Sequence, residues 1–568
     1  MKKTTILLLL IIMGVLTGLN AQERKKDKLF KIDGNLGLFY DMYDYNTTNY
    51  PTFRPRYEDN IVRFTANANI QIGKHFSLPF GINISNRKTS YNLPNLPDEN
   101  LFSYVQNPRN NIHLDPTYKW VKWHLGSHTP DYSTLTTGDI QIFGVGVDIN
   151  PGKFILSANY GKSQIAIEPD ILLNVPGAYK QNLFGARIGF GKVEGSKFTF
   201  NFVKIKDDVN SVITQPIGYD PIEGITISPL VEVKMFKKLT LKTETAASIY
   251  TNNLLAGPMP FDDEIVDAVS NYVTVNSSSV ADFSHATSLQ WKAKAFLLGG
   301  EVKYIGPGFT PVGYRNIEKD IIDYKINTGF KLFKKKLDIK GMFGVRTNNI
   351  KNTTLQSTKR IISNMNLFAQ VSKAFSVNVN YNNFGFRNNL DDNTLRVEMV
   401  NNSLSIAPSY QIQGKTKQHL ITAVFALNNF EQYDTTVLDF ITTDSKTYNA
   451  NYMLIFKNIP LNIGLSGMYL QNRSSLTDLD ITNYGISAGY RLFKKKLRPS
   501  ISVNYATVAR DNFTPDKRIN TKIKLKYKIN KKMKLKVSYS LNNNKYGDSR
   551  PGAILNENKI QFSILKKL

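Results

Sequence analysis

Two consecutive runs near the C-terminus alternate lysine with apolar residues, KIKLKYKI at 522–529 and MKLKV at 533–537. A β-strand points successive side chains to opposite faces, so the lysines of both runs share one face. A row of ammonium groups raises the local concentration of anions, and in a pore it favours anionic solutes. We therefore predict a basic lumen lining made of Lys522, Lys524, Lys526, Lys528, Lys534 and Lys536.

This lysine row also has a structural interpretation. The ammonium groups could pair with acidic side chains on loops that fold inward, or they could simply be hydrated. Nearer the middle of the chain, an ion-paired patch is predicted where four charged residues flank one turn and share a face: Glu232, Lys234, Lys242 and Glu244.

Catalytic chemistry has weak support in the chain. His124 or His128 could serve as a base for Ser127 or Ser133, but no local signature fixes such a pair. There is no cysteine, which excludes disulfides, iron–sulfur clusters and cysteine-ligated zinc. We predict neither an enzyme nor a cofactor.

Two further motifs are candidate ligand sites. An acidic loop patch could attract a divalent cation but lacks the spacing of a calcium loop, so a solvated loop helix is favoured. Gly306-Pro307-Gly308 is not followed by the helix and Lys-Ser/Thr of a phosphate loop, so it predicts a bend. The patch consists of Asp262, Asp263, Glu264 and Asp267.

The elements that would position these residues are marked by a repeated lysine-rich turn. It occurs as KLFKKKLDIK at Lys331–Lys340, RLFKKKLRPS at Arg491–Ser500 and KMFKKLTLK at Lys234–Lys242. In each copy one alternating run ends, lysines follow, and a second alternating run begins at once, which predicts a tight hairpin at a membrane rim. The turn lysines are Lys237, Lys238, Lys334, Lys335, Lys336, Lys494, Lys495 and Lys496. Aromatic residues just before the turns predict an interfacial girdle, with the lysines reaching lipid phosphates: Phe236, Phe333, Phe456 and Phe493.

Alternating runs of this kind continue through most of the chain. Twelve short turns, among them one at Asp115-Pro116 and one at Leu297, plus an opening strand near Phe30–Tyr43 and a closing strand near Lys559–Leu568, give about 26 strands, with a range of 22–26. The fold class is therefore all-β, a single large antiparallel transmembrane β-barrel. Pro229 and Pro408 fall on apolar strand positions, which predicts a bulge or a shifted register there.

A barrel of this size is ~50 Å across, too wide for wall side chains alone to fill. Only Gln22–Leu29 precede the first strand, which leaves no room for a globular plug. We expect inward-folded loops to occupy the lumen, chiefly Asn252–Ser284 and Lys88–Asn110.

The N-terminus has the features of a secretory signal. Lys2 and Lys3 precede the apolar run Ile6–Leu16, and a cleavage site before Gln22 follows. We predict a signal peptide at 1–21, a barrel at 22–568 without a separate plug or periplasmic domain, and location in the outer membrane. The formal net charge of +27 would suit nucleic acid, but export argues against that partner.

Two segments carry a resemblance to known proteins: HTPDYSTLTTGDIQIFGVGVDINPGKFILSANYGKSQ at His128–Gln164, and VKYIGPGFTPVGYRNIEKDIIDYKINTGFKLFKKKLDIKG at Val302–Gly341. They resemble a group of large, mostly uncharacterised outer-membrane β-barrel proteins of Bacteroidota. Those proteins share a Tyr-Ser-x-Leu-Thr stretch, a Gly-x-Gly strand, a Pro-Gly turn and a later Gly-Pro-Gly-Phe/Tyr element. The resemblance covers about an eighth of the chain and implies the outer membrane, with no catalytic or ligand residues to carry over.

The function predicted from the sequence is a channel or transport protein for anionic solutes, gated or filled by its own loops. The alternative is a non-conducting scaffold or accessory subunit of an envelope secretion, assembly or motility complex, and a third is a soluble periplasmic β-sheet protein. The partners expected are outer-membrane lipid, the barrel assembly machinery and envelope proteins.

Overall fold

The computed structural model describes residues 30–57, 59–85, 101–172, 175–258, 264–312, 317–390, 392 and 394–568. The predicted signal peptide lies outside these residues, and the division at residue 21 stays a prediction. No helix within the described residues is long and apolar enough to cross a membrane.

The described part of the chain contains 27 strands and four short helical segments. The strands are β1 Phe30–Thr48, β2 Asn60–Ile72, β3 Phe76–Ser85, β4 His113–Leu114, β5 Thr117–Tyr118, β6 Val121–His128, β7 Ile142–Ile149, β8 Phe154–Gln164, β9 Lys180–Gly191, β10 Lys197–Asp208, β11 Glu223–Met235, β12 Leu239–Thr251, β13 Ser279–Lys292, β14 Phe296–Ile305, β15 Ile321–Leu332, β16 Leu337–Asn348, β17 Thr358–Gln370, β18 Phe375–Asn388, β19 Glu398–Gln413, β20 Lys417–Asp434, β21 Asp439–Phe456, β22 Leu461–Ser474, β23 Leu479–Tyr490, β24 Leu497–Arg510, β25 Asp516–Lys528, β26 Met533–Lys545 and β27 Ile554–Lys567. The helical segments are α2 Leu101–Gln106, η1 Pro108–Asn110, α3 Glu264–Ser270 and η2 Phe333–Lys335.

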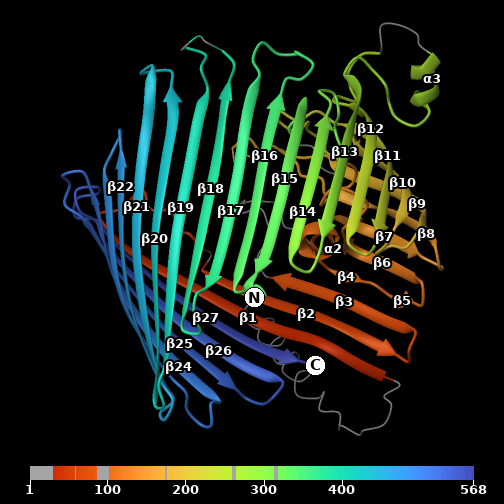
Figure 1. Ribbon diagram of the computed structural model, residues 1–568. Coiled ribbons are helices and arrows are strands. Elements are labelled where there is room, and N and C mark those ends of the chain that lie inside the picture. The colour runs from red at the N-terminus through yellow and green to blue at the C-terminus, as the bar shows by residue number, and fades with distance from the viewer. Residues whose placement is uncertain are drawn as a thin grey trace.

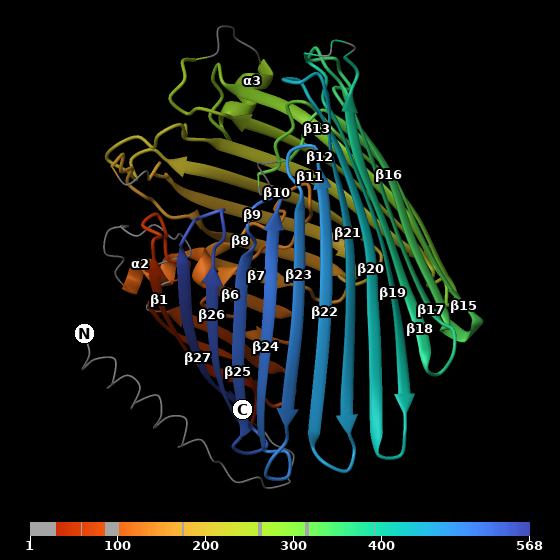
Figure 2. The same cartoon turned by 90° about the vertical axis from the view of Figure 1, so that its left-hand side faces the viewer.

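These strands form one closed antiparallel sheet (Figures 1 and 2). Each strand pairs with its neighbours in sequence, and β1 pairs with β27 from Asn35↔Lys567 to Thr48↔Ile554, which closes the cylinder. β4 and β5 pair with β3 on one side and β6 on the other, so together they fill one position. The 27 strands therefore occupy 26 positions, and the predicted all-β antiparallel barrel of about 26 strands is confirmed.

The two faces of the sheet differ in chemistry, as the period-two pattern predicts. One face carries exposed apolar side chains, such as Ile523 with 46% of its surface accessible. Following the register around the sheet, the opposite face carries the lysine row on β25 and also Val203 and Ile205, which are fully buried beneath loops. The apolar face is thus the outer wall, where hydrocarbon can cover it, and the other face is the lumen side.

Short turns lie at one rim, and the three lysine-rich copies share an unusual backbone. Phe236 and Lys237, Phe333 to Lys335, and Phe493 to Lys495 all have φ between 49° and 70°, in the left-handed region. Repeated sequence therefore gives repeated geometry. The chain's three tryptophans, Trp120, Trp123 and Trp291, lie near this rim and are about half exposed.

Two of the predicted turns are wrongly placed. Asp115-Pro116 is a break inside the β4–β5 position, and the chain reverses at Lys119-Trp120 instead. Leu297 lies in β14, and the reversal before it falls at 293–295. In the first case the turn-favouring pair Asp115-Pro116 stands a few positions from the actual turn.

The prediction of a bulge at the two prolines is wrong. Phe200↔Pro229 and Val377↔Pro408 pair in unbroken register, and on the other side of each proline the register resumes without a shift. Proline has no N–H group to donate. Each strand lacks paired positions at the proline and at the residue before it, and only toward the strand that follows it in sequence. Each strand therefore keeps its register, with a local gap in its hydrogen bonds.

The expected inward loop Asn252–Ser284 is also corrected. Its residues 272–274 lie on the outer wall, where Tyr272 O accepts a hydrogen bond from Lys204 Nζ (2.6 Å) and Thr274 Oγ1 donates to Glu223 (2.6 Å). Lys204 and Glu223 are on the outward face by strand alternation. Figure 1 shows α3, from the same loop, at the end of the barrel away from the short turns.

The second expected loop is only partly described. Residues 88–100 of Lys88–Asn110 lie outside the described part of the chain. The rest includes α2, which contacts the ends of β3 and β8: Tyr104 OH accepts from Ser85 N (3.0 Å), and Lys162 Nζ donates to Gln106 Oε1 (2.6 Å).

The wall is uneven in height. β6 and β7 have 8 residues each, whereas β20 and β21 have 18 each. The short strands follow the broken β4–β5 position directly, so the low part of the wall is continuous.

Candidate functional site

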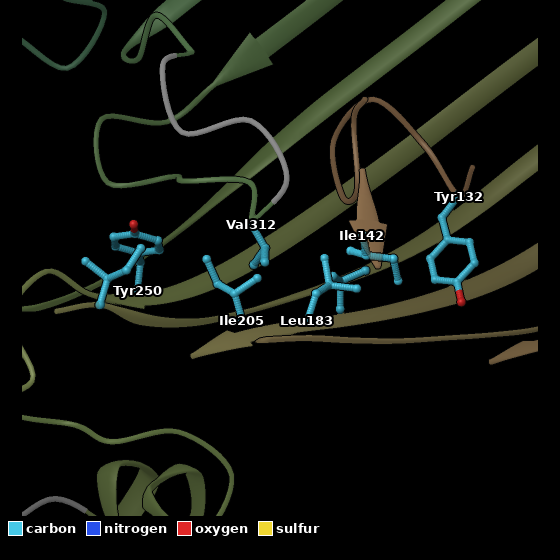
Figure 3. Close-up of a cluster of buried hydrophobic side chains, with 8 residues drawn as sticks. Tyr132, Ile142, Leu183, Ile205, Tyr250 and Val312 are labelled. Carbon is cyan, nitrogen blue, oxygen red and sulfur yellow. The ribbon is translucent and has the colours of Figure 1, made fainter. Parts of the chain in front are cut away.

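Two chain segments fold into the lumen and pack on the inner wall. The first inner segment, residues 129–141, lies between β6 and β7, and the second inner segment, residues 306–312 and 317–320, lies between β14 and β15. Tyr132 and Val312 meet Leu183, Ile205 and Tyr250 of the wall in one buried cluster (Figure 3). Leu135 and Phe309 meet in a second cluster, so the segments contact each other as well as the wall.

Both inner segments come from the stretches that carry the family resemblance. The Tyr-Ser-x-Leu-Thr stretch is Tyr132–Thr136, in which Leu135 and Thr136 are fully buried. Gly306-Pro307-Gly308 makes the predicted bend over the inner wall, where Gly308 N donates to Asp282 Oδ2 (2.9 Å). A Cβ on Gly306 would collide with the Asp282 carboxylate, so this close approach requires glycine.

Polar contacts fix the first inner segment. Tyr132 OH accepts from Asn159 Nδ2 (2.8 Å), and the Arg187 guanidinium lies 4.6 Å from the Tyr132 ring centre. Burial raises the pKa of Tyr132 to about 12, so the phenol keeps its proton at physiological pH. Ser133 Oγ donates to Glu244, a buried carboxylate that also accepts from Ser228 Oγ (2.6 Å).

The predicted ion-paired patch around Glu244 is only partly right. Glu232 lies 3.3 Å from Lys234 and 3.6 Å from Lys197 of the neighbouring strand. Glu244 instead accepts hydroxyl hydrogen bonds, because the first inner segment brings Ser133 to it. In the described residues neither Glu244 nor Lys242 forms an ion pair.

The histidines and serines weighed for catalysis have other partners. His124 lies between Asp115 (3.2 Å) and Asp148 (3.0 Å), and its ring stacks on His128. His128 contacts Gly126 O and Asn159 Oδ1. Ser127 Oγ accepts from Ile112 N, and Ser133 binds Thr136 and Glu244. The structure therefore uses these side chains to hold the wall and the first inner segment together.

No group of three or more potential His or carboxylate ligands converges within the described part of the chain. Of the acidic loop patch, Asp262 and Asp263 lie outside the described residues, while Glu264 and Asp267 are in α3.

The six predicted lumen lysines lie on the inner face of β25 and β26. Lys526 stands opposite Lys536, and Lys528 opposite Lys534. Lys522 is half-buried and the other five are exposed. The described loops therefore do not cover the lumen side of these lysines. None of the six is within ion-pair distance of a carboxylate among the described residues. Pairing with acidic side chains, the first structural interpretation, therefore has no contact to support it.

The row belongs to a longer basic lane that sequence reasoning missed. On the inner face of β24, β25 and β27 it continues with Arg498, Arg518, Lys559 and Lys567. The alternation within β24 and β27 was a usable signal, but the cross-strand register that aligns these cations with the row was not readable from the sequence. Asp516 and Glu557 are the acidic residues on the inner face of β24–β27.

At the long-loop end the lane meets aromatic residues. Tyr43 OH donates to Glu557 Oε1 (2.8 Å), Lys559 Nζ lies 3.6 Å from the Tyr57 ring centre, and Arg550 lies 4.5 Å from that of Tyr50. The β1–β2 and β26–β27 loops therefore join at the mouth of the lane.

The eight predicted turn lysines are exposed at the short-turn rim, away from the lane. Phe236, Phe333 and Phe493 beside them are also largely exposed. Their contact with lipid phosphates stays a prediction.

The inner segments and the lane lie on opposite sides of the lumen. β12, which carries Glu244 beneath the first inner segment, is 13 strands before β25, half of the 26 positions. One side of the lumen is thus covered by loops with a buried core, while the other exposes cations.

No protein family model matches the chain, and no curated protein matches it. Among solved structures, it is similar to the translocation pore of the P pilus usher PapC (8% identity, 94% of this chain and 99% of that chain, TM-score 0.36). It is also similar to OccAB4 of Acinetobacter baumannii (12%, 66% and 98%, 0.29) and OccK11 of Pseudomonas aeruginosa (8%, 95% and 96%, 0.29). At these values the likeness carries no argument about function.

Proposed function

We propose that the protein is an outer-membrane channel that passes anionic solutes along the basic lane. The observation that carries the proposal is the inner-face lysine row, exposed to the lumen and without carboxylate partners in the described residues. Unpaired ammonium groups on one side of a pore attract anions and repel cations. The apolar outer wall and the three half-exposed tryptophans near the short-turn rim support placement in a membrane.

The inner segments supply the constriction that a channel of this width requires. A cylinder of 26 strands is ~50 Å across, and an unobstructed lumen of that size would barely select. The two segments occupy the side opposite the lysine row and leave a passage in which solutes move alongside the lysines.

The test is the reversal potential of single channels in a planar bilayer under a potassium chloride gradient. We expect the wild-type channel to prefer chloride, and the preference to fall toward none when all six lumen lysines are replaced by glutamine. The matched control replaces Lys334, Lys335 and Lys336 of a rim turn by glutamine, which lowers the charge without touching the lane, and should keep most of the preference.

Two results would contradict the proposal. A preference for potassium, or the same selectivity in the six-lysine variant as in the wild type, removes the lane as the path of anions. A correctly folded protein that stays silent and co-purifies with other envelope proteins supports the scaffold alternative instead.

A further inference from the structure

A second group of lysines lies on the outer wall, at the long-loop end of β8–β11. Cross-strand register places Lys162, Asn182, Lys206 and Glu223 side by side on four successive strands. The next row on the same face, closer to the middle of the wall, begins with Tyr160 and Phe184 and continues with Lys204. Cations therefore stand directly above aromatic rings on a surface that faces away from the lumen.

One buried carboxylate holds two of these lysines in place. Glu223 is 1% exposed, and its two oxygens lie 2.8 Å from Lys204 Nζ and 3.0 Å from Lys206 Nζ. The side chain of Lys206 remains 52% exposed, and an ammonium group has three donors, so it keeps N–H groups for another acceptor. The cations are thus preorganised by a group that a ligand cannot reach.

The local charge balance is positive. Lys180 pairs with Asp208 (2.6 Å), and Lys162 contacts only the neutral Gln106 side chain among its described hydrogen bonds and ion pairs. Four lysines therefore face two carboxylates, Asp208 and Glu223, which leaves an excess of two positive charges on the outer surface.

A hollow of about 700 Å³ opens beside these residues. The rings of Tyr160 and Phe184 and the side chains of Leu254 and Leu255 form its apolar lining. Its polar lining includes Lys204 and Lys206 together with Asp207 and Asp208, of which Asp208 is paired with Lys180. The β12–β13 loop, which folds over the outer wall here, contributes the two leucines. An apolar hollow bordered by ammonium groups matches an amphiphile with an anionic head.

We propose that this hollow binds a lipid from the outer leaflet whose phosphate head is net anionic, with its phosphate on Lys206 and Lys204 and an acyl chain against Tyr160, Phe184 and Leu255. The inference rests on the membrane placement proposed above and is independent of the lumen lane. Basic residues at the headgroup level attract anionic lipid by about 1 kcal/mol each, which is about fivefold in affinity.

The experiment measures lipid retained by the full-length barrel, using native mass spectrometry after purification in a neutral detergent. The probe is dioleoylphosphatidic acid, compared with dioleoylphosphatidylcholine and with inorganic phosphate. We expect the wild type to retain phosphatidic acid, and Lys206→Gln to retain it about fivefold less. Lys204 still neutralises Glu223 in this variant, so the fold is kept.

A second variant and a matched control sharpen the result. Leu255→Gln leaves every charge in place and should also weaken phosphatidic acid retention, because it removes apolar lining. The control is Lys517→Gln with Lys545→Gln, a cross-strand pair on the outer face at the same end of β25 and β26 that does not line this hollow, and it should leave phosphatidic acid retention unchanged.

Three results would each overturn the proposal. The first is that Lys206→Gln retains as much phosphatidic acid as the wild type. The second is that the wild type retains as much phosphatidylcholine as phosphatidic acid. The third is that inorganic phosphate alone occupies the wild type as fully as phosphatidic acid does, which would indicate a free-phosphate site. Chloride preference measured on the same preparations separates this outcome from failure of the channel proposal, since Lys206→Gln should leave selectivity unchanged.

Discussion

At the scale of single residues, the glycines of the second inner segment decide how closely it approaches the wall. Asp282 binds the backbone N–H of Gly308, and its carboxylate occupies the space that a Cβ on Gly306 would need. The motif Gly-Pro-Gly thus has a packing role here, with no ligand required to explain it.

Gly306→Ala should therefore destabilise the barrel by about 1–3 kcal/mol, because the added methyl group displaces Asp282 and breaks its hydrogen bond. Urea unfolding in detergent micelles measures the effect. Gly300→Ala in the adjoining strand β14 is the control, since no described atom lies within 4 Å of the Cβ position there. Equal stability of the two variants would contradict the packing role.

At the scale of elements, the strands could be predicted from the sequence and the loop directions could not. Alternation is a local property, so Lys522–Ile529 and its neighbours reveal their faces without any tertiary information. Whether a loop turns inward depends on its tertiary contacts. Leu135 packs in one cluster with Phe309, 174 residues away in the chain, whereas Thr274 forms a hydrogen bond with Glu223 on the outer wall. The apolar residues Tyr132, Leu135 and Phe309 inside loop segments were the available signal.

The two loop directions predict different effects on conductance. Replacing residues 130–140 with a short glycine–serine linker should raise single-channel conductance, because the first inner segment no longer occupies the lumen. Removing α3, residues 264–270, from the loop that lies over the outer wall is the control and should leave conductance unchanged. A larger effect from α3 would mean that the β12–β13 loop, and not the first inner segment, limits the passage.

At the scale of the whole molecule, the basic lane exists only because the cylinder closes. Lys559 and Lys567 of the last strand join Lys534 and Lys536 of β26 through register, and β1 seals the other side. Composition indicated an excess of positive charge, but its concentration on one side of the lumen depends on pairings between strands that no local pattern encodes.

Because the lumen is wide, selectivity should depend strongly on salt. The Debye length falls from ~10 Å at 0.1 M salt to ~3 Å at 1 M, so at high salt the lane's field reaches far less of the passage left between the lane and the inner segments. Reversal potentials measured from 0.1 M to 1 M potassium chloride should show chloride preference declining toward none. Selectivity that does not change with salt would point to a narrow, dehydrated contact instead.

The uneven wall has a consequence for the surrounding bilayer. Eight residues at ~3.3 Å each, tilted by ~40°, span ~20 Å, whereas eighteen span ~45 Å, and the apolar band of such barrels is ~25 Å tall. In the proposed membrane placement, lipids beside β6 and β7 must thin to match this low side, while β20 and β21 extend beyond the hydrocarbon layer. In that placement the protein imposes an uneven hydrophobic mismatch, with a thinned membrane beside β6 and β7.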